Sequence, residues 1–171
     1  MIVLLTIGIF LGFYIFATKN TPRIKSFLLG IAAGVFVFFL FFVRNTLYSF
    51  VLLPEKTLLF NIVVEETTKI VALLFILRSK PPSSYWSAYG IGWGFASVEH
   101  LVLVISQGNI SLARMLFAST LHIITLFCFL FVLHIRKKRN GWQLLRAIFA
   151  WSSSILIHYT YNWTLQKLLW V

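Results

Sequence analysis

Negatively charged residues are scarce in this sequence. Aspartate is absent, and four glutamates stand against 15 lysines and arginines in a chain of 171 residues. Charged residues make up 11% of the chain and hydrophobic residues 60%, whereas soluble proteins average about 25% and about 45–50%. The composition therefore excludes a soluble globular domain and indicates a protein embedded in a membrane.

Cysteine is also nearly absent. The single Cys128 lies within a hydrophobic run, so neither an internal disulfide nor a metal site built on paired cysteines is available. The hydrophobic run from Met1 to Ala17 lacks the basic start and the small-residue cleavage site of a secretory signal. We predict that this run is a retained first membrane span.

Polar gaps divide the chain into hydrophobic segments of the length that a helix needs to cross a bilayer. The segments are residues 2–17, 26–43, 57–77, 84–105, 112–134 and 147–168. We predict an all-α fold, a polytopic membrane bundle of about six transmembrane helices, in which residues 1–171 form a single integral membrane domain. Residues 44–56 include an apolar stretch too short to cross alone, which is either an interfacial or re-entrant segment or an extension of the second span.

The basic residues lie in short polar gaps beside hydrophobic runs. This is the pattern of the positive-inside rule, and it argues against a nucleic-acid partner. Ten basic residues fall on one side of the predicted bundle: Lys19, Arg23, Lys25, Arg78, Lys80, Arg136, Lys137, Lys138, Arg139 and Arg146. Four fall on the other: Arg44, Lys56, Arg114 and Lys167. We predict a multi-pass protein of the cell (plasma) membrane, in contact with the lipid bilayer, with both termini extracytoplasmic.

Three of the four glutamates, Glu65, Glu66 and Glu99, fall inside predicted spans. An ionisable residue at the centre of a membrane helix costs about 2.5–3.5 kcal/mol, so such residues face a bundle interior or a water-filled cavity and mark function by default. The structural alternative is a buried ion pair, which Glu65 and Lys69 could form at spacing i,i+4. That pair would explain only two of the polar residues in the spans.

Four polar side chains on different predicted helices lie at a similar depth. Counting about 1.5 Å per residue places Glu65, Glu99, His122 and His158 roughly 9–15 Å below the outer surface. One hydrated pocket that opens to the extracytoplasmic side would produce this agreement. The i,i+4 spacing also puts Asn162 on the face of His158.

The fourth span adds an aromatic ring and several small residues near this level. Phe95 lies one turn before Glu99, while Gly90, Gly92 and Gly94 are predicted to allow close helix packing rather than phosphate binding. His100 points about 100° away from Glu99 on an ideal helix, and His134 adjoins a basic loop. We predict that neither histidine takes part in the chemistry.

Carboxylates and imidazoles in one low-dielectric cavity suit hydrolysis. A buried carboxylate can act as a general base toward water, and imidazole or carboxamide groups can bind the oxyanion. Zinc is a possible cofactor, with Glu99, His122 and His158 as candidate ligands. No H-E-x-x-H helix and no G-x-S-x-G turn is present, so neither the usual zinc-protease signal nor a serine nucleophile is indicated.

Several separated motifs carry a family resemblance. The segment Glu65–Lys69 is similar to E-E-x-x-K, Gly92–Glu99 to G-x-G-F-A-x-x-E, His122–Thr125 to H-x-x-T, and His158–Asn162 to H-x-x-x-N. In this order, one to a span, they resemble the PrsW family of intramembrane proteases, related to the CAAX proteases and bacteriocin-processing enzymes. The resemblance covers about residues 57–162, and the catalytic core is expected over about 57–168.

The resemblance implies an endopeptidase that cleaves a membrane-anchored protein substrate, similar to an anti-sigma factor, near the extracytoplasmic surface. By analogy with the CAAX enzymes, Glu65 would activate water, and His158 with Asn162 would bind the oxyanion. Glu66, Glu99 and His122 would complete the cluster or bind a metal, with Lys69 and Phe95 in support. The CAAX enzymes typically have His where Glu99 stands, which favours the PrsW branch.

Other readings of the same residues remain open. Buried Glu, Lys and His also build proton or solute pathways, although no internal repeat or broken-helix pair is evident. A catalytically silent membrane scaffold is a further alternative. Within the enzyme class, the alternative is a CAAX-type prenyl-protein protease.

Overall fold

The computed structural model describes residues 21–50, 58–78, 83–108, 112–134 and 143–169, and all regular structure in these ranges is helical. The helices are α2 (Thr21–Phe50), α3 (Leu58–Arg78), α4 (Ser84–Gln107), α5 (Leu112–His134) and α6 (Gln143–Leu169). The prediction of an all-α protein is confirmed. The predicted span at residues 2–17 lies outside the described residues.

Three of the described helices are long and apolar enough to cross a membrane. The segments that qualify are Arg23–Thr46, Ser84–Ser106 and Arg114–Val132. The prediction of about six spans is therefore not supported by composition. In α3 the reason is a charged centre, because Glu65, Glu66 and Lys69 fall within its 21 residues. In α6 serines, His158 and Asn162 interrupt the apolar sequence.

Helix α2 extends beyond the predicted second span. It continues without a break through Arg44 to Phe50, so the first part of the apolar stretch after Arg44 prolongs this helix. Residues 51–57, which complete the stretch, lie outside the described part of the chain. Of the two interpretations left open by the sequence, the structure therefore favours the extension as far as Phe50.

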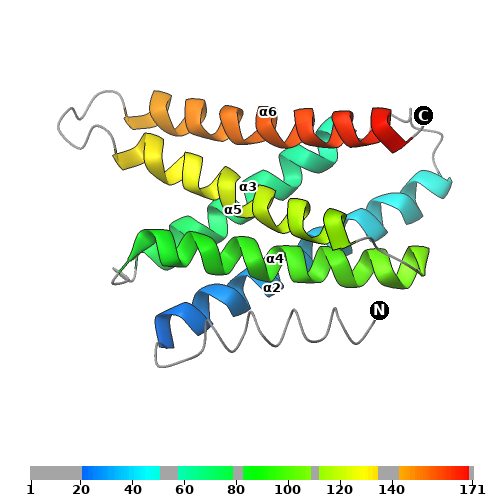
Figure 1. Ribbon diagram of the computed structural model, residues 1–171, viewed down its shortest axis with the longest axis horizontal. Coiled ribbons are helices and arrows are strands. Elements are labelled where there is room, and N and C mark those ends of the chain that lie inside the picture. Colours follow the sequence, from blue (N-terminus) through cyan, green and yellow to red (C-terminus); the bar gives the residue numbers. More distant parts are fainter. Residues whose placement is uncertain (1–20, 51–57, 79–82, 109–111, 135–142, 170–171) are drawn as a thin grey trace.

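The described helices alternate in direction along the chain. Arg23 near the start of α2 lies 4.2 Å from the ring centre of Trp86 near the start of α4, and Gly34 further along α2 lies against Val98. Helices α2 and α4 are therefore parallel. The intervening α3 crosses the bundle in the opposite direction, and α5 runs antiparallel to α4 (Figure 1).

Local sequence sets the ends of α4. Ser83 has extended backbone angles, and its hydroxyl accepts a hydrogen bond from the amide of Trp86, which satisfies one of the free amides at the helix start. At the other end Gly108 has φ 70°, and its amide donates to the Val104 carbonyl. This left-handed conformation favours glycine and stops the helix one turn after Val104.

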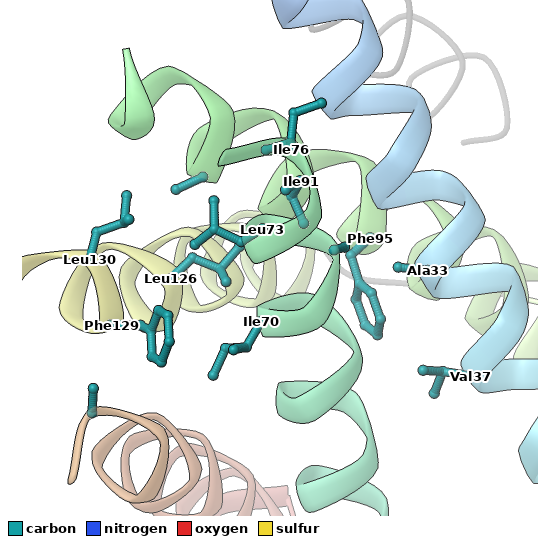
Figure 2. Packing of buried hydrophobic residues seen from close by; sticks show 13 residues of the cluster. Ala33, Val37, Ile70, Leu73, Ile76, Ile91, Phe95, Leu126, Phe129 and Leu130 are labelled. Atoms are coloured by element: carbon teal, nitrogen blue, oxygen red, sulfur yellow. The ribbon is translucent and has the colours of Figure 1, made fainter. Parts of the chain in front are cut away.

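The hydrophobic core lies where α2, α3, α4 and α5 meet. Figure 2 shows Leu73 of α3 beside Leu126 of α5, and Phe95 of α4 directed toward Ala33 and Val37 of α2. All five side chains are less than a tenth exposed. The phenylalanines and leucines on the outer faces of the helices are exposed instead, which is the pattern of helices surrounded by lipid.

Two glycines allow α2 and α4 to approach each other closely. A Cβ atom on Gly94 would overlap the Phe27 carbonyl, and one on Gly30 would overlap the Ile91 backbone. These neighbours are backbone atoms and cannot move aside as a flexible side chain can. The predicted close helix packing is confirmed at Gly94, and Gly30, for which no such packing was predicted, lies equally close to a neighbouring backbone.

Replacing Gly94 with leucine is expected to destabilise the protein by more than the roughly 1–3 kcal/mol typical of an overpacked core, because α2 and α4 must separate. The measurement is thermal unfolding in detergent. The control is Ala32→Leu, since Ala32 is exposed on α2. Equal unfolding temperatures for the two variants would contradict the packing argument.

Candidate functional site

Lys69 lies at the centre of a polar cluster inside the bundle. Its ammonium group is fully buried and lies 2.6 Å from Glu66 Oε1, 2.9 Å from His122 Nδ1 and 3.4 Å from Thr125 Oγ1. An ammonium group has three hydrogen-bond donors and no acceptor. All three donors of Lys69 therefore have partners, from α3 itself and from α5.

Glu66 is the counter-ion of Lys69 and also joins α3 to α6. Its Oε1 accepts from Lys69 and lies 2.6 Å from Nδ1 of His158. Because a carboxylate that already binds an ammonium can only accept, His158 Nδ1 must carry the proton. The buried Oε2 has no partner in the described part of the chain, and such an acceptor is suited to an ordered water.

The protonation of His122 follows from its two neighbours. Lys69 can only donate, so Nδ1 of His122 accepts, and the ring proton of the neutral imidazole is on Nε2. Nε2 lies 2.6 Å from Glu99 Oε2 and donates to it. The ring packs on Phe95 with 5.0 Å between ring centres. A Cβ atom on Gly92 would lie 3.0 Å from the His122 backbone, closer than an ordinary contact, so α4 and α5 pack tightly beside this histidine.

His158 and Glu65 face each other across a wider gap. Since Nδ1 of His158 donates to Glu66, the Nε2 of a neutral ring carries a lone pair. This Nε2 lies 3.7 Å from Glu65 Oε2, too far for a direct hydrogen bond. Two acceptors at this separation suit a water that donates to both of them.

The cluster has a buried part and an accessible part. We call Glu66, Lys69, His122 and His158 the inner group, because their side chains are at most 4% exposed. The outer carboxylates are Glu65 and Glu99, whose side chains are 17% and 25% exposed. Each outer carboxylate lies beside one imidazole of the inner group, and these imidazole rings are 5.4 Å apart at their centres.

The structure brings together most of the residues predicted from the sequence, though with a different ion pair. Lys69 pairs with Glu66 at spacing i,i+3, not with Glu65, because the helix turns Glu66 toward α5 and α6. Asn162 is half-buried one turn after His158 on α6. Phe95 contacts the Lys69 ammonium as well as His122, with 5.4 Å from Nζ to the ring centre.

Three residues near the cluster were not among the predicted site residues. Thr125 completes the shell of Lys69, and its position in the H-x-x-T motif is the signal that could have found it. Tyr161 and His100 lie within electrostatic range of Glu99. The His100 ring is 4% exposed, and its Nε2 has no hydrogen-bond partner among the described residues. The His134 side chain lies outside the described part of the structure.

The side chains best placed to share a metal differ from the predicted set. Glu66, His122 and His158 each offer a ligand atom, and these atoms lie within 4.8 Å of one another. Zinc is often held by three such ligands and a water. However, the Lys69 ammonium already contacts Glu66 Oε1 and His122 Nδ1. These two atoms are therefore not available to a divalent ion while the charged lysine is in place. The predicted ligand Glu99 instead accepts from the other ring nitrogen of His122.

A separate apolar groove lies between α2 and α3. It has a volume of about 520 Å³ and includes Leu29 and Phe36 on α2 and Thr68, Val71 and Phe75 on α3. Its lining contains no ionisable side chain. The groove therefore has no groups for acid–base chemistry, and the polar cluster remains the candidate site.

Comparison of the chain with protein-family models, with curated proteins and with solved structures found no match.

Proposed function

We propose that this chain is an intramembrane endopeptidase in which Glu65 activates a water molecule. The observation that carries the proposal is the arrangement of the cluster: two partly exposed carboxylates, each beside an imidazole held by a buried Lys–Glu pair, from four helices. Carboxylates and histidines that lie together in a low-dielectric interior are the groups used for general acid–base catalysis.

The attacking water would bind between Glu65 Oε2 and His158 Nε2. Both atoms accept hydrogen bonds, so a water there directs its lone pair away from them and toward a substrate carbonyl. Glu65 takes a proton from the water as the oxygen attacks the carbonyl carbon. Glu65 then donates this proton to the nitrogen of the leaving amine as the peptide bond breaks.

The developing oxyanion needs a hydrogen-bond donor. Asn162 lies one turn from His158 and supplies an amide donor on the same face of α6. His158 Nε2 becomes a second donor only when the ring is doubly protonated, because Nδ1 keeps its proton toward Glu66. Glu99 would orient substrate groups at the accessible edge, where His122 fixes the direction of its carboxylate.

We place α3 and α6 in the membrane with the other described helices, as part of a multi-pass bundle of about six spans, because Glu65, Glu66 and Lys69 of α3 and His158 of α6 face the cluster rather than lipid. The substrate is a membrane-anchored protein, similar to an anti-sigma factor, cut near the extracytoplasmic side of the plasma membrane. The PrsW-like motifs and the positive-inside pattern support this assignment.

The test is cleavage of a candidate substrate by the purified chain in lipid vesicles. The substrate has a single hydrophobic anchor and a tagged segment on the outer side. Wild-type protein is expected to release the tagged fragment. Proton or solute flux without any cleavage would support the transport alternative. The absence of both cleavage and flux would support the silent scaffold.

His158→Ala is expected to lower the cleavage rate by about 100-fold or more, because the water loses one of its two acceptors. The fragment is quantified by gel and mass spectrometry. His134→Ala serves as the control, since His134 is the last residue of α5 and was predicted to lie outside the chemistry. A cleavage rate in His158→Ala equal to that of wild type would show that this histidine has no part in the mechanism.

A further inference from the structure

Lys69 makes the contacts that a metal ion would make in a buried site of glutamate and histidine ligands. Its Nζ lies 2.6 Å from Glu66 Oε1 and 2.9 Å from His122 Nδ1, with all of these side chains fully buried. These are two of the three side chains in the cluster that are close enough to share an ion, His158 being the third. The lysine therefore uses two of the lone pairs that a divalent ion would bind, on Glu66 Oε1 and His122 Nδ1.

The lysine also has the orienting effect of a metal on its histidine ligand. In metal sites, a ligating histidine directs its second ring nitrogen, as N–H, to a carboxylate. Here Lys69 contacts Nδ1 of His122, and Nε2–H donates to Glu99 at 2.6 Å. The sequence of groups from cation to imidazole to carboxylate is the same, with an ammonium in place of the ion.

Charge repulsion also disfavours a metal ion beside Lys69. The Lys69 ammonium neutralises Glu66, to which it is bonded. A divalent ion beside the ammonium would put like charges a few ångströms apart in a low-dielectric interior, which is strongly unfavourable. The two cations therefore exclude each other.

We propose that Lys69 is the resident cation of this site, takes the place of a divalent metal ion, and fixes His122 with its proton on Nε2. Lys69 is thus a positioning residue that acts on Glu99 through His122. Its positioning role in catalysis rests on the proposed function, whereas the exclusion of metal does not.

Cobalt binding tests the proposal without any cleavage assay. The purified full chain in detergent is titrated with Co²⁺, whose visible absorption reports histidine and carboxylate ligands. Wild-type protein is expected to bind no Co²⁺ at the cluster, whereas Lys69→Ala binds about one per chain, as in a site with three protein ligands. This absorption is expected to be lost in Lys69→Ala/His122→Ala. Lys25→Ala, at an exposed position on α2, is the control and should match wild type.

Two results would overturn the proposal. One is a cobalt signal in wild-type protein that His122→Ala removes, and the other is a folded Lys69→Ala that binds no cobalt. If Lys69→Ala does not fold, nitrogen NMR of histidine-labelled wild-type protein decides. His122 is expected to have a proton on Nε2 and none on Nδ1, and the opposite tautomer would contradict the role of Lys69. Because neither readout depends on cleavage, failure of the protease assignment is distinguishable from failure of this proposal.

Discussion

Glu65→Gln is expected to lower the rate of substrate cleavage by about 100- to 10,000-fold, the usual contribution of a general base. Glutamine has nearly the same shape but cannot take a proton from water. Glu65 Oε2 lies 3.7 Å from His158 Nε2, and its side chain is 17% exposed. The substitution therefore removes the base while leaving the surrounding contacts in place. The measurement is the rate of fragment release under single-turnover conditions in vesicles.

The same substitution at Glu55 is the matched control. Glu55 is the one acidic residue outside the predicted spans, and Glu55→Gln is expected to keep the wild-type rate. Unfolding temperatures of both variants should stay close to that of wild type. If Glu65→Gln cleaves as fast as the control, the base lies elsewhere, and Glu99 is then the carboxylate to test.

Breaking the Lys69–Glu66 pair from either side is expected to destabilise the protein by about 3–5 kcal/mol, because one buried charge is left without a partner. Both side chains are fully buried and lie 2.6 Å apart. The double variant Glu66→Gln/Lys69→Met leaves no such charge and should lose far less than the sum of the two single losses. The measurement is reversible unfolding in mixed micelles, analysed as a double-mutant cycle.

Glu65→Gln is the internal control for that cycle. It is the same chemical change one residue earlier, at a partly exposed carboxylate that has no contact with Lys69 within salt-bridge range. We expect a smaller change than for Glu66→Gln, because Glu65 is partly exposed and has no ion pair with Lys69 to lose. If the losses of unfolding free energy in Glu66→Gln and Lys69→Met were additive, the two side chains would not be coupled. That result would contradict the Lys69–Glu66 ion pair of the inner group.

The residues of the cluster could be predicted because charge is costly in a membrane. Glu65, Glu66 and Glu99 stand out against hydrophobic surroundings. The predicted depth of His122 and His158 indicated that these histidines lie at the level of the glutamates. The structure places these side chains in contact through four helices. Their catalytic roles remain predictions.

The pairing within the cluster could not be predicted from spacing. On a helix, residues three and four apart are both neighbours, so Lys69 could reach Glu65 or Glu66. The choice is made by α5 and α6, because His122 and Thr125 hold the lysine on the side of Glu66. For the same reason the metal ligands inferred from depth included Glu99, whereas the groups that converge include Glu66.

The number of spans was the least predictable part of the fold. Hydrophobic length alone does not distinguish a helix in contact with lipid from one that carries charges into the bundle. Helix α3 combines a 21-residue length with the buried Glu66 and Lys69. These charged groups are satisfied by contacts with other helices, and they keep α3 out of the three described helices that are apolar enough to cross a membrane.

The most direct test of the central claim follows the oxygen of the attacking water. Cleavage of the anchored substrate is carried out in water enriched in heavy oxygen, and the fragments are weighed by mass spectrometry. Wild-type protein is expected to place one heavy oxygen in the new carboxyl terminus of the fragment, and Glu65→Gln is expected to form no labelled fragment at a comparable rate. Labelled fragments in equal yield from both proteins, or no fragment from wild type with any membrane-anchored substrate, would contradict the claim.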